Sequence, residues 1–434
     1  MNHTDASARA SAPHAALARL VVRTEPVDEL APLIPRADPR HPLLWMRRGE
    51  GIVGLGETLR IETSGPDRVE DAAATWIELA ALADIDDRVG LPGTGLVAFG
   101  AFAFADESAS TSVLVVPELV LGRRDGRAWV TRISLATGDD EAADAAASVT
   151  LEIPEPAPKR RVPRVTFAPG AVPPEEYEAA VAEAVRRIDA GELEKVVLAR
   201  QLVGELHEED GLRATINRLA EDYPDTWVFA VDGLIGASPE TLVRVDHGTV
   251  SARVLAGTTS RGAGEASDRE RAVALAHSAK DRAEHALAVA SAVKRLAPHT
   301  ARLDTSPEPF TLQLPNLWHL ATDLKGTLGD GSSALDLVRA VHPTAAVAGT
   351  PRRVALPAIA ELEGFDRGRY AGPVGWIDGD GDGEWAIALR CAQVDSDGTV
   401  TAYAGCGIVH DSVPADELAE TDMKFRPIVE AFGG

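Results

Sequence analysis

Short apolar segments separated by turn residues fill most of this sequence, and their order constrains the fold more than any other feature. Between Leu20 and Leu151 the segments have strand length, and only residues 69–82 show a helical pattern. Later in the chain, strand patterns over residues 226–255 precede one long helical pattern over residues 268–296. Strands and helices therefore come in blocks. This order predicts an α+β fold of layered antiparallel β-sheets flanked by helices.

Charge excludes several classes of partner. The 434 residues carry 43 Lys+Arg against 67 Asp+Glu, a formal net charge of -24, whereas nucleic acids and anionic membranes bind basic surfaces. No apolar run approaches the ~20 residues of a membrane span, and the N-terminus lacks the apolar core of a signal peptide. The two cysteines, Cys391 and Cys406, are too few for a disulfide framework. We therefore expect a soluble cytoplasmic protein, in which an anionic substrate needs a local cluster of cations.

Two strand ends bring together residues that can transfer protons. Lys195 begins the apolar run to Arg200, with Val197 and Ala199 on its face of the strand. Glu240 lies in a small-residue turn after one hydrophobic strand over residues 226–237. We expect adjacent strands to deliver this lysine and glutamate. Such a pair can be a general base and acid, or only an ion pair at the strand ends.

Two pairs of carboxylates lie on predicted helices. Asp281 and Glu284 fall within the 268–296 helical pattern, and Glu417 and Glu420 fall in the last helix, which begins near residue 415. A spacing of three places both members of a pair on one helical face. Four such carboxylates from two helices would suit Mg²⁺, although each pair alone is also common on solvated helices.

Further residues are ordinary when taken alone. His319 is compatible with a hydrogen-bonded core histidine, Lys424 with an ion pair to Glu420, and Arg390 with a charge at a strand end. The glycines of Ala404-Gly-Cys-Gly407 are expected to shape a turn.

In their order along the chain, however, these residues resemble one family. The matching segments are Glu194-Lys-Val-Val-Leu-Ala-Arg200, Gly236-Ala-Ser-Pro-Glu240, Leu255-Ala-Gly-Thr258, Ser278-Ala-Lys-Asp-Arg-Ala-Glu-His285, Asn316-Leu-Trp-His-Leu-Ala-Thr322, His342-Pro-Thr-Ala-Ala-Val347, Arg369-Tyr-Ala-Gly-Pro-Val-Gly-Trp376, Gly381-Asp-Gly-Glu-Trp385, Ala404-Gly-Cys-Gly-Ile-Val409 and Glu420-Thr-Asp-Met-Lys424. From Lys195 onward the chain resembles the chorismate-utilising enzymes, most closely the isochorismate synthases. The resemblance implies a variable N-terminal half over residues 16–164 and a chorismate-binding catalytic region over 165–434. The Ala/Ser-rich residues 1–15 are expected to be a disordered N-terminus.

The resemblance also implies a role for each matching residue. Lys195 would be the general base that activates water, and Glu240 the general acid that protonates the leaving hydroxyl. A free lysine titrates near ~10.4, so a lysine base needs burial or neighbouring cations. Glu284 and Glu420 would hold Mg²⁺, with Asp281 and Glu417 completing its shell. The substrate chorismate would be bound by Gly257, Thr258, His319, Tyr370, Arg390, Gly405 and Lys424.

The same motifs indicate which branch of the family the chain resembles. The His342-Pro-Thr form and Tyr370-Ala-Gly-Pro-Val-Gly-Trp376 are similar to isochorismate synthases. Nothing in the sequence resembles the glutamine amidotransferase that supplies ammonia in related enzymes, and we expect a monomer without such a subunit. A salicylate synthase that releases pyruvate stays open because of Ala256-Gly-Thr258, as does an inactive chorismate-binding protein. The product can feed menaquinone, siderophore or salicylate synthesis.

Overall fold

The computed structural model describes residues 19–136, 152–207, 211–314 and 317–434. The predicted disordered segment 1–15 lies outside these residues, as does Asn316 at the start of one matching motif. Within them the chain forms two large β-sheets, of 13 and 10 strands, with helices on their faces. The pairing is antiparallel apart from β1 with β5, so the predicted α+β fold is confirmed.

The larger sheet joins strands from both ends of the chain. In spatial order its strands are β10 (Ala168–Pro169), β11 (Lys195–Glu205), β23 (Thr399–Ile408), β22 (Cys391–Val394), β13 (Leu234–Ser238), β12 (Trp227–Val231), β2 (Leu43–Arg47), β3 (Glu50–Leu55), β8 (Leu119–Arg124), β9 (Arg127–Leu135), β1 (Leu20–Val27) and β5 (Asp84–Asp87), with β19 (Gly349–Thr350) beside β11.

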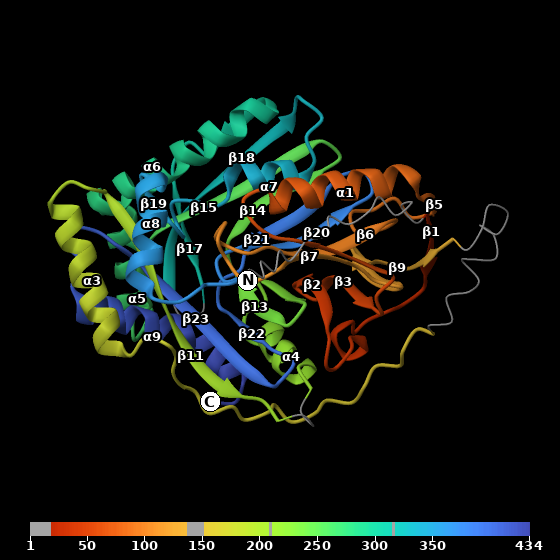
Figure 1. Ribbon diagram of the computed structural model, residues 1–434, viewed down its shortest axis with the longest axis horizontal. Helices are drawn as coiled ribbons and strands as arrows, with labels where there is room; N and C mark the ends of the chain where they lie inside the picture. The colour runs from red at the N-terminus through yellow and green to blue at the C-terminus, as the bar shows by residue number, and fades with distance from the viewer. Residues whose placement is uncertain (1–18, 137–151, 208–210, 315–316) are drawn as a thin grey trace, which may run out of the picture.

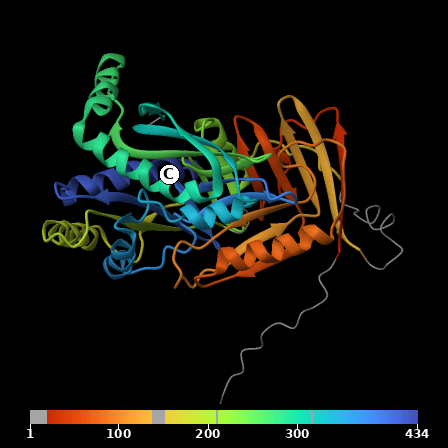
Figure 2. The same cartoon turned by 90° about the horizontal axis from the view of Figure 1, so that it is seen from above.

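The smaller sheet has the same mixed origin. Its strands are β16 (Thr300–Thr305), β18 (Leu317–Leu328), β15 (Thr249–Ser260), β14 (Thr241–Asp246), β21 (Gly383–Ile387), β20 (Pro373–Asp378), β6 (Val97–Ala101), β7 (Ser112–Val116) and β4 (Leu59–Thr63), with β17 (Phe310–Gln313) beside β18. In both sheets a strand of the N-terminal half pairs with one of the C-terminal half, β2 with β12 and β6 with β20. The N-terminal strands gather at one end of the molecule (Figures 1 and 2).

Helices cover the outer faces of the sheets. They are α1 (Arg68–Leu82), α3 (Pro174–Asp189), α4 (Arg213–Asp222), α5 (Glu265–His277), α6 (Ala279–Leu296), α7 (Ala334–Val341), α8 (Arg352–Glu363) and α9 (Pro414–Ala431), with 3₁₀ turns η1 (Ile34–Arg36) and η2 (Ala297–His299). Figure 1 shows α1, α7 and α6 along one side of the molecule and α4 and α9 along the other. None of the helices among the described residues is long and apolar enough to cross a membrane.

Two apolar cores hold these layers together. The larger one includes Trp45, Phe99 and Trp385, so it joins strands of both sheets. The smaller one packs Phe425 of α9 and Ile216 of α4 against the other face of the 13-stranded sheet. Between the sheets the Trp45 indole donates a hydrogen bond of 3.0 Å to Glu384 of β21. Both cores therefore position α9 and the strands of the site relative to each other.

Two of the predicted elements are wrong in detail. The helix predicted over residues 268–296 is two helices, because Ser278 has an extended backbone and its hydroxyl accepts a hydrogen bond from the Asp281 N–H, which begins α6. The single strand predicted over residues 226–237 is the hairpin β12–β13. Its turn has left-handed backbone at Asp232 (φ 50°) and Gly233 (φ 79°), which reverses the chain.

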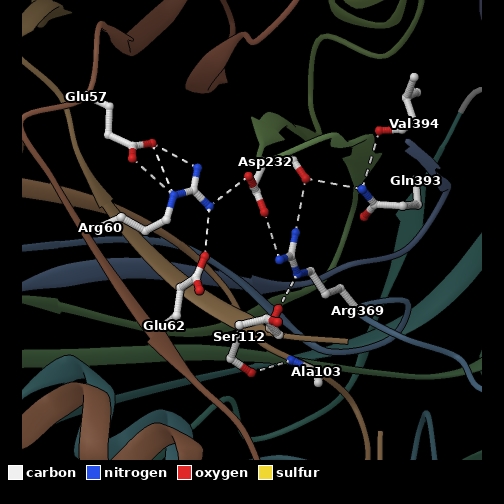
Figure 3. A network of polar contacts seen from close by, with 10 residues as sticks. Glu57, Arg60, Glu62, Ala103, Ser112, Asp232, Arg369, Gln393 and Val394 are labelled. Atoms are coloured by element: carbon white, nitrogen blue, oxygen red, sulfur yellow. Dashed lines mark hydrogen bonds and ion pairs between the residues drawn. The ribbon is translucent and has the colours of Figure 1, made fainter. Parts of the chain in front are cut away.

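A polar network anchors this hairpin turn to both halves of the chain (Figure 3). The Asp232 carboxylate lies 2.9 Å from Arg60 of β4 and 2.8 Å from Arg369. Arg369 also donates hydrogen bonds to the carbonyl oxygens of Thr111 and Asp232. Burial alone would raise the pKa of Asp232, but the two guanidinium groups outweigh burial and lower this pKa. The network fixes the segment that continues into Tyr370.

Candidate active site

Every residue predicted for the site lines one cavity of about 280 Å³. The cavity lies between the ends of strands of both sheets and the helices α6 and α9. Its walls include both proposed proton-transfer residues, both carboxylate pairs and the predicted substrate contacts. The cavity gathers residues from 195 to 424, so only the tertiary fold assembles it.

Lys195 enters the cavity from the first position of β11. Its ammonium lies 2.5 Å from the Glu284 carboxylate of α6, and its side chain is 13% exposed. A Cβ on Gly407, which pairs with Val197 in the neighbouring strand β23, would stand 2.6 Å from the Lys195 Cε atom. A side chain at this position would therefore displace the end of the Lys195 side chain.

Glu240 lies on another part of the wall, directly after β13. It is 6% exposed, and burial raises the pKa of its carboxyl to about 8, against the opposing charges of Lys195 and Arg390. A carboxyl with this pKa holds its proton at neutral pH and can donate it to a leaving group. This property is what a general acid requires.

The predicted adjacency of the two strands is wrong. Strands β23 and β22 lie between β11 and β13 in the sheet. At about 4.8 Å per strand, β11 and β13 are roughly 14 Å apart in the sheet, and Glu240 follows the end of β13 by two residues. The two side chains therefore reach the same cavity from different parts of its wall.

A β-bulge forms the wall that carries Thr258 and His319. The register of β15 with β18 shifts between Ala256 and Thr258, and Gly257 at the bulge has φ +82°. A Cβ there would contact Asp281 at 3.1 Å, so the glycine lets α6 approach. The Thr258 hydroxyl lies 2.9 Å from His319 Nδ1, and burial, with Arg390 and Lys424, lowers the pKa of His319 to about 3. His319 is therefore a neutral imidazole at working pH.

Arg390 and Tyr370 supply a cation and a hydroxyl to the cavity. Arg390 has a left-handed backbone (φ 51°) between β21 and β22, and its carbonyl accepts a hydrogen bond from Ala237. The Tyr370 ring stacks on Tyr403 with centroids 5.1 Å apart, and burial raises the pKa of its hydroxyl well above the ordinary value. A neutral phenol beside a guanidinium can bind a carboxylate.

The second carboxylate pair lies on α9. Lys424 lies 2.6 Å from Glu420 and donates a hydrogen bond of 2.9 Å to the Gly405 carbonyl. Burial alone would raise the pKa of Glu420, but Lys424 outweighs burial and lowers it. Glu417 accepts a hydrogen bond from the Ser412 hydroxyl, and burial raises its pKa.

These carboxylates fit a divalent cation by their chemistry. Oxygens of Glu417 and Glu420 and the Cys406 sulfur lie within 4.8 Å of one another, while Asp281 and Glu284 line the same cavity from α6. Burial raises the pKa of the Cys406 thiol to about 12, so it stays protonated and leaves oxygen atoms as the donors. Oxygen donors are those that Mg²⁺ prefers. Glu284 forms an ion pair with Lys195, and Glu420 forms one with Lys424. A positive charge is therefore favourable beside both carboxylates.

Comparison with known proteins identifies the family. The model of the family described as chorismate binding enzyme matches residues 4–433. The chain belongs to this family. The resemblance drawn from the motifs is thus confirmed at the level of the family.

Among individual relatives, the chain is 39% identical to isochorismate synthase DhbC of Bacillus subtilis over 60% of this chain and 68% of that protein. It is 33% identical to the salicylate biosynthesis isochorismate synthase of Pseudomonas aeruginosa, over 94% of this chain and 89% of that protein. The solved structure of the menaquinone-specific isochorismate synthase MenF of Escherichia coli superposes with a TM-score of 0.78 at 25% identity, covering 95% of each chain.

Two residues of this chorismate-binding fold were not among the predicted site residues. Gly407 makes room for Lys195, and the glycines of Ala404–Gly407 lie inside β23 rather than in the predicted turn. His285 contacts the Ala256 carbonyl at 3.2 Å and the Thr322 hydroxyl at 2.7 Å, which ties α6 to the bulge. The signal for both was their place inside the family motifs, next to residues with an assigned role.

Proposed function

We propose that this protein is a magnesium-dependent isochorismate synthase, which isomerises chorismate by water attack at ring carbon C2 and loss of the C4 hydroxyl. The observation that carries the proposal is the pair Lys195 and Glu240, which face one cavity from separated strands, with Glu240 protonated at neutral pH. A base and an acid placed apart serve a reaction in which water adds at one ring carbon while hydroxide leaves another.

In this mechanism each side chain moves one proton. Lys195 takes a proton from the attacking water, and the resulting hydroxide forms the bond to C2. The ring double bonds shift, the C4–O bond breaks, and Glu240 gives its proton to the departing hydroxide, which leaves as water. The ring therefore gains one hydroxyl and loses one, and the product is an isomer of the substrate.

Other residues hold the two carboxylates of the substrate. Arg390 and Tyr370 would bind the enolpyruvyl carboxylate, while Thr258, His319 and Lys424 line the ring pocket and Gly257 and Gly405 let the backbone approach. Glu284 and Glu420 would hold Mg²⁺, with Asp281 and Glu417 beside them; when bound, the ion would neutralise and orient the ring carboxylate. The positive groups needed on a chain of net charge -24 are thus gathered at one place.

A product analysis tests the proposal. Purified protein is incubated with chorismate and Mg²⁺, the products are separated by chromatography, and pyruvate is measured with a coupled assay. We expect isochorismate without pyruvate. Salicylate with equimolar pyruvate would show a salicylate synthase instead, and binding of chorismate without turnover would show an inactive binding protein. The named relatives serve menaquinone and salicylate synthesis, so the proposal concerns the product and not its pathway.

A further inference from the structure

One edge of the strand that carries Lys195 is only partly covered by other strands. Along its first edge β11 pairs continuously with β23 from Val196 to Glu205. Along its second edge it pairs with β19 at Lys195 and Val196, and with β10 at Leu202 and Val203. Between these two short pairings, among the described residues, no strand covers the second edge. This gap begins two residues after Lys195.

Main-chain hydrogen bonds close the two ends of the gap, from the Val197 N–H to the Ala348 carbonyl at 2.9 Å and from the Gly170 N–H to the Gln201 carbonyl at 3.0 Å. Side chains of one buried ion pair fill the middle. The Ala199 N–H donates a hydrogen bond of 2.7 Å to Glu363 Oε1, and the Val197 carbonyl accepts one of 2.9 Å from Arg367 Nη2. Glu363 is the last residue of α8, and Arg367 follows it by four residues. In the middle of this edge of β11, a carboxylate and a guanidinium therefore take the place of a strand.

The ion pair is itself held in a fixed geometry. Arg367 Nε donates to Glu363 Oε2 at 2.8 Å, and Arg367 Nη1 donates to the Val347 carbonyl at 2.8 Å. Both residues are only 3% exposed. Burying an ion pair costs desolvation free energy. One effect of such a pair is that it specifies a single arrangement of the groups around it. Because the pair is neutral as a whole, it orders the strand without adding net charge to the cavity.

The same guanidinium also reaches the wall that carries Tyr370. Its central carbon lies 4.4 Å from the ring centroid of Phe104 and 5.9 Å from that of Tyr370. Arg367 thus contacts three segments of the cavity wall, namely β11, the loop at Val347 and the segment of Tyr370. Arg367 itself also lines the cavity.

We propose that Glu363 and Arg367 are positioning residues for catalysis, which hold the edge of β11 so that Lys195 stands at the reacting face of the cavity. This inference rests on the proposed function, in which Lys195 is the base. Displacement of a base by about 1 Å can lower turnover by roughly 100-fold, so a strand edge fixed by side chains matters for rate more than for binding.

The test compares two buried arginines. In Arg367→Lys, one ammonium cannot reach Val197, Val347 and Glu363 together. Arg68→Lys is the matched control, because Arg68 is 4% exposed and also donates to main-chain carbonyls, those of Ala103 and Phe104, but does not touch β11. We expect Arg367→Lys to lower kcat at least about tenfold with KM within about threefold, and Arg68→Lys to keep kcat within about twofold.

Amide hydrogen exchange provides a readout that needs no turnover. In Arg367→Lys the peptide over residues 195–200 should exchange at least about tenfold faster than in the parent, and it should be unchanged in Arg68→Lys. Unchanged exchange or an unchanged kcat in cooperatively folded Arg367→Lys would overturn the proposal, as would an equal loss of kcat in Arg68→Lys. If the parent makes no isochorismate, the proposed function fails, while the exchange result still decides the role in β11.

A second variant covers the case in which Arg367→Lys does not fold. Glu363→Asp keeps the charge pair but is one methylene shorter, so it cannot contact Ala199 and Arg367 in the same geometry. We expect a folded protein with faster exchange at residues 195–200 and a kcat lowered by about threefold or more. Parent-like exchange and kcat in this variant would overturn the proposal.

Discussion

Lys195 and Glu284 contact each other directly: the ammonium nitrogen lies 2.5 Å from a carboxylate oxygen, although 89 residues separate them in the sequence. The proposed base and a proposed magnesium ligand therefore share one ion pair. An ammonium has no lone pair to offer to water, so a base role for Lys195 requires the loss of a proton as well as separation from Glu284. Lys424 and Glu420 form a similar ion pair on α9, with 2.6 Å between the ammonium nitrogen and a carboxylate oxygen.

Removal of the Lys195 amine should abolish turnover. We expect Lys195→Ala to lower kcat by at least about 100-fold, since general base catalysis contributes about 10²–10⁴-fold. The fold should persist, because the side chain lies at a cavity wall and its loss leaves no unfilled core. Steady-state kinetics with chorismate checks this, with Lys294→Ala on the exposed face of α6 as the control. A near-normal rate in Lys195→Ala would remove it as the base.

Loss of either carboxylate should weaken magnesium binding. Glu284→Ala and Glu420→Ala each remove oxygen donors from the cavity and leave a lysine without its partner. We expect the Kd for Mg²⁺ to rise by about tenfold or more in each variant, measured by isothermal titration without substrate. Glu361→Ala, whose side chain is 64% exposed and pairs with Arg187, serves as the control. Unchanged titrations in both site variants would refute the assignment.

The rate should fall at alkaline pH. Glu240 can donate a proton only while protonated, and its pKa is raised to about 8 by burial. We therefore expect kcat to decrease about tenfold per pH unit above pH 8. The measurement is kcat at saturating chorismate and Mg²⁺ from pH 6 to pH 10. A profile that stays level to pH 10 would argue against Glu240 as the acid.

The same carboxyl should destabilise the fold at high pH. An unfolded glutamate titrates near ~4.3 and folded Glu240 at about 8, so between these values the folded state holds a proton that the unfolded state releases. Stability then falls as pH rises through this window. Glu240→Gln should lose turnover. Because glutamine does not titrate, the effect of this substitution on the free energy of unfolding should be roughly 1–3 kcal/mol more favourable at pH 8 than at pH 5. Urea unfolding at the two pH values checks this, and equal effects at both would contradict it.

The network of Asp232 should stabilise the fold at neutral pH. Asp232→Asn removes the charge that Arg60 and Arg369 share, and we expect a loss of roughly 1–3 kcal/mol in the free energy of unfolding at pH 7. Because the pKa of Asp232 is lowered in the folded state, this difference should begin to shrink below about pH 4 and be lost only as pH falls through the lowered pKa of the folded state. Chemical unfolding at pH 7 and at a series of acidic pH values checks it. Asp225→Asn, at a 59% exposed side chain, should change stability by less than about 0.5 kcal/mol.

The sequence by itself determined the class of fold and named the candidate residues of the site. Alternating apolar segments predict strands locally, and motifs around Lys195, Glu240 and Glu284 name the chemistry, since both depend on residues near one another in the chain. Breaks within helices and strands were harder to predict from the sequence. The turn at Asp232–Gly233 and the cap at Ser278 depend on one or two residues whose effect the apolar pattern hides.

The tertiary structure alone decided which residues meet. The order β11, β23, β22, β13 separates Lys195 from Glu240, and α6 brings Glu284 to Lys195, while Glu363 and Arg367 complete an edge of β11. Such pairings are non-local: their energy comes from burial and hydrogen bonding between segments that are far apart in the chain. Local patterns do not encode which segments become neighbours, so the sequence named the candidate residues of the site but did not reveal their geometry.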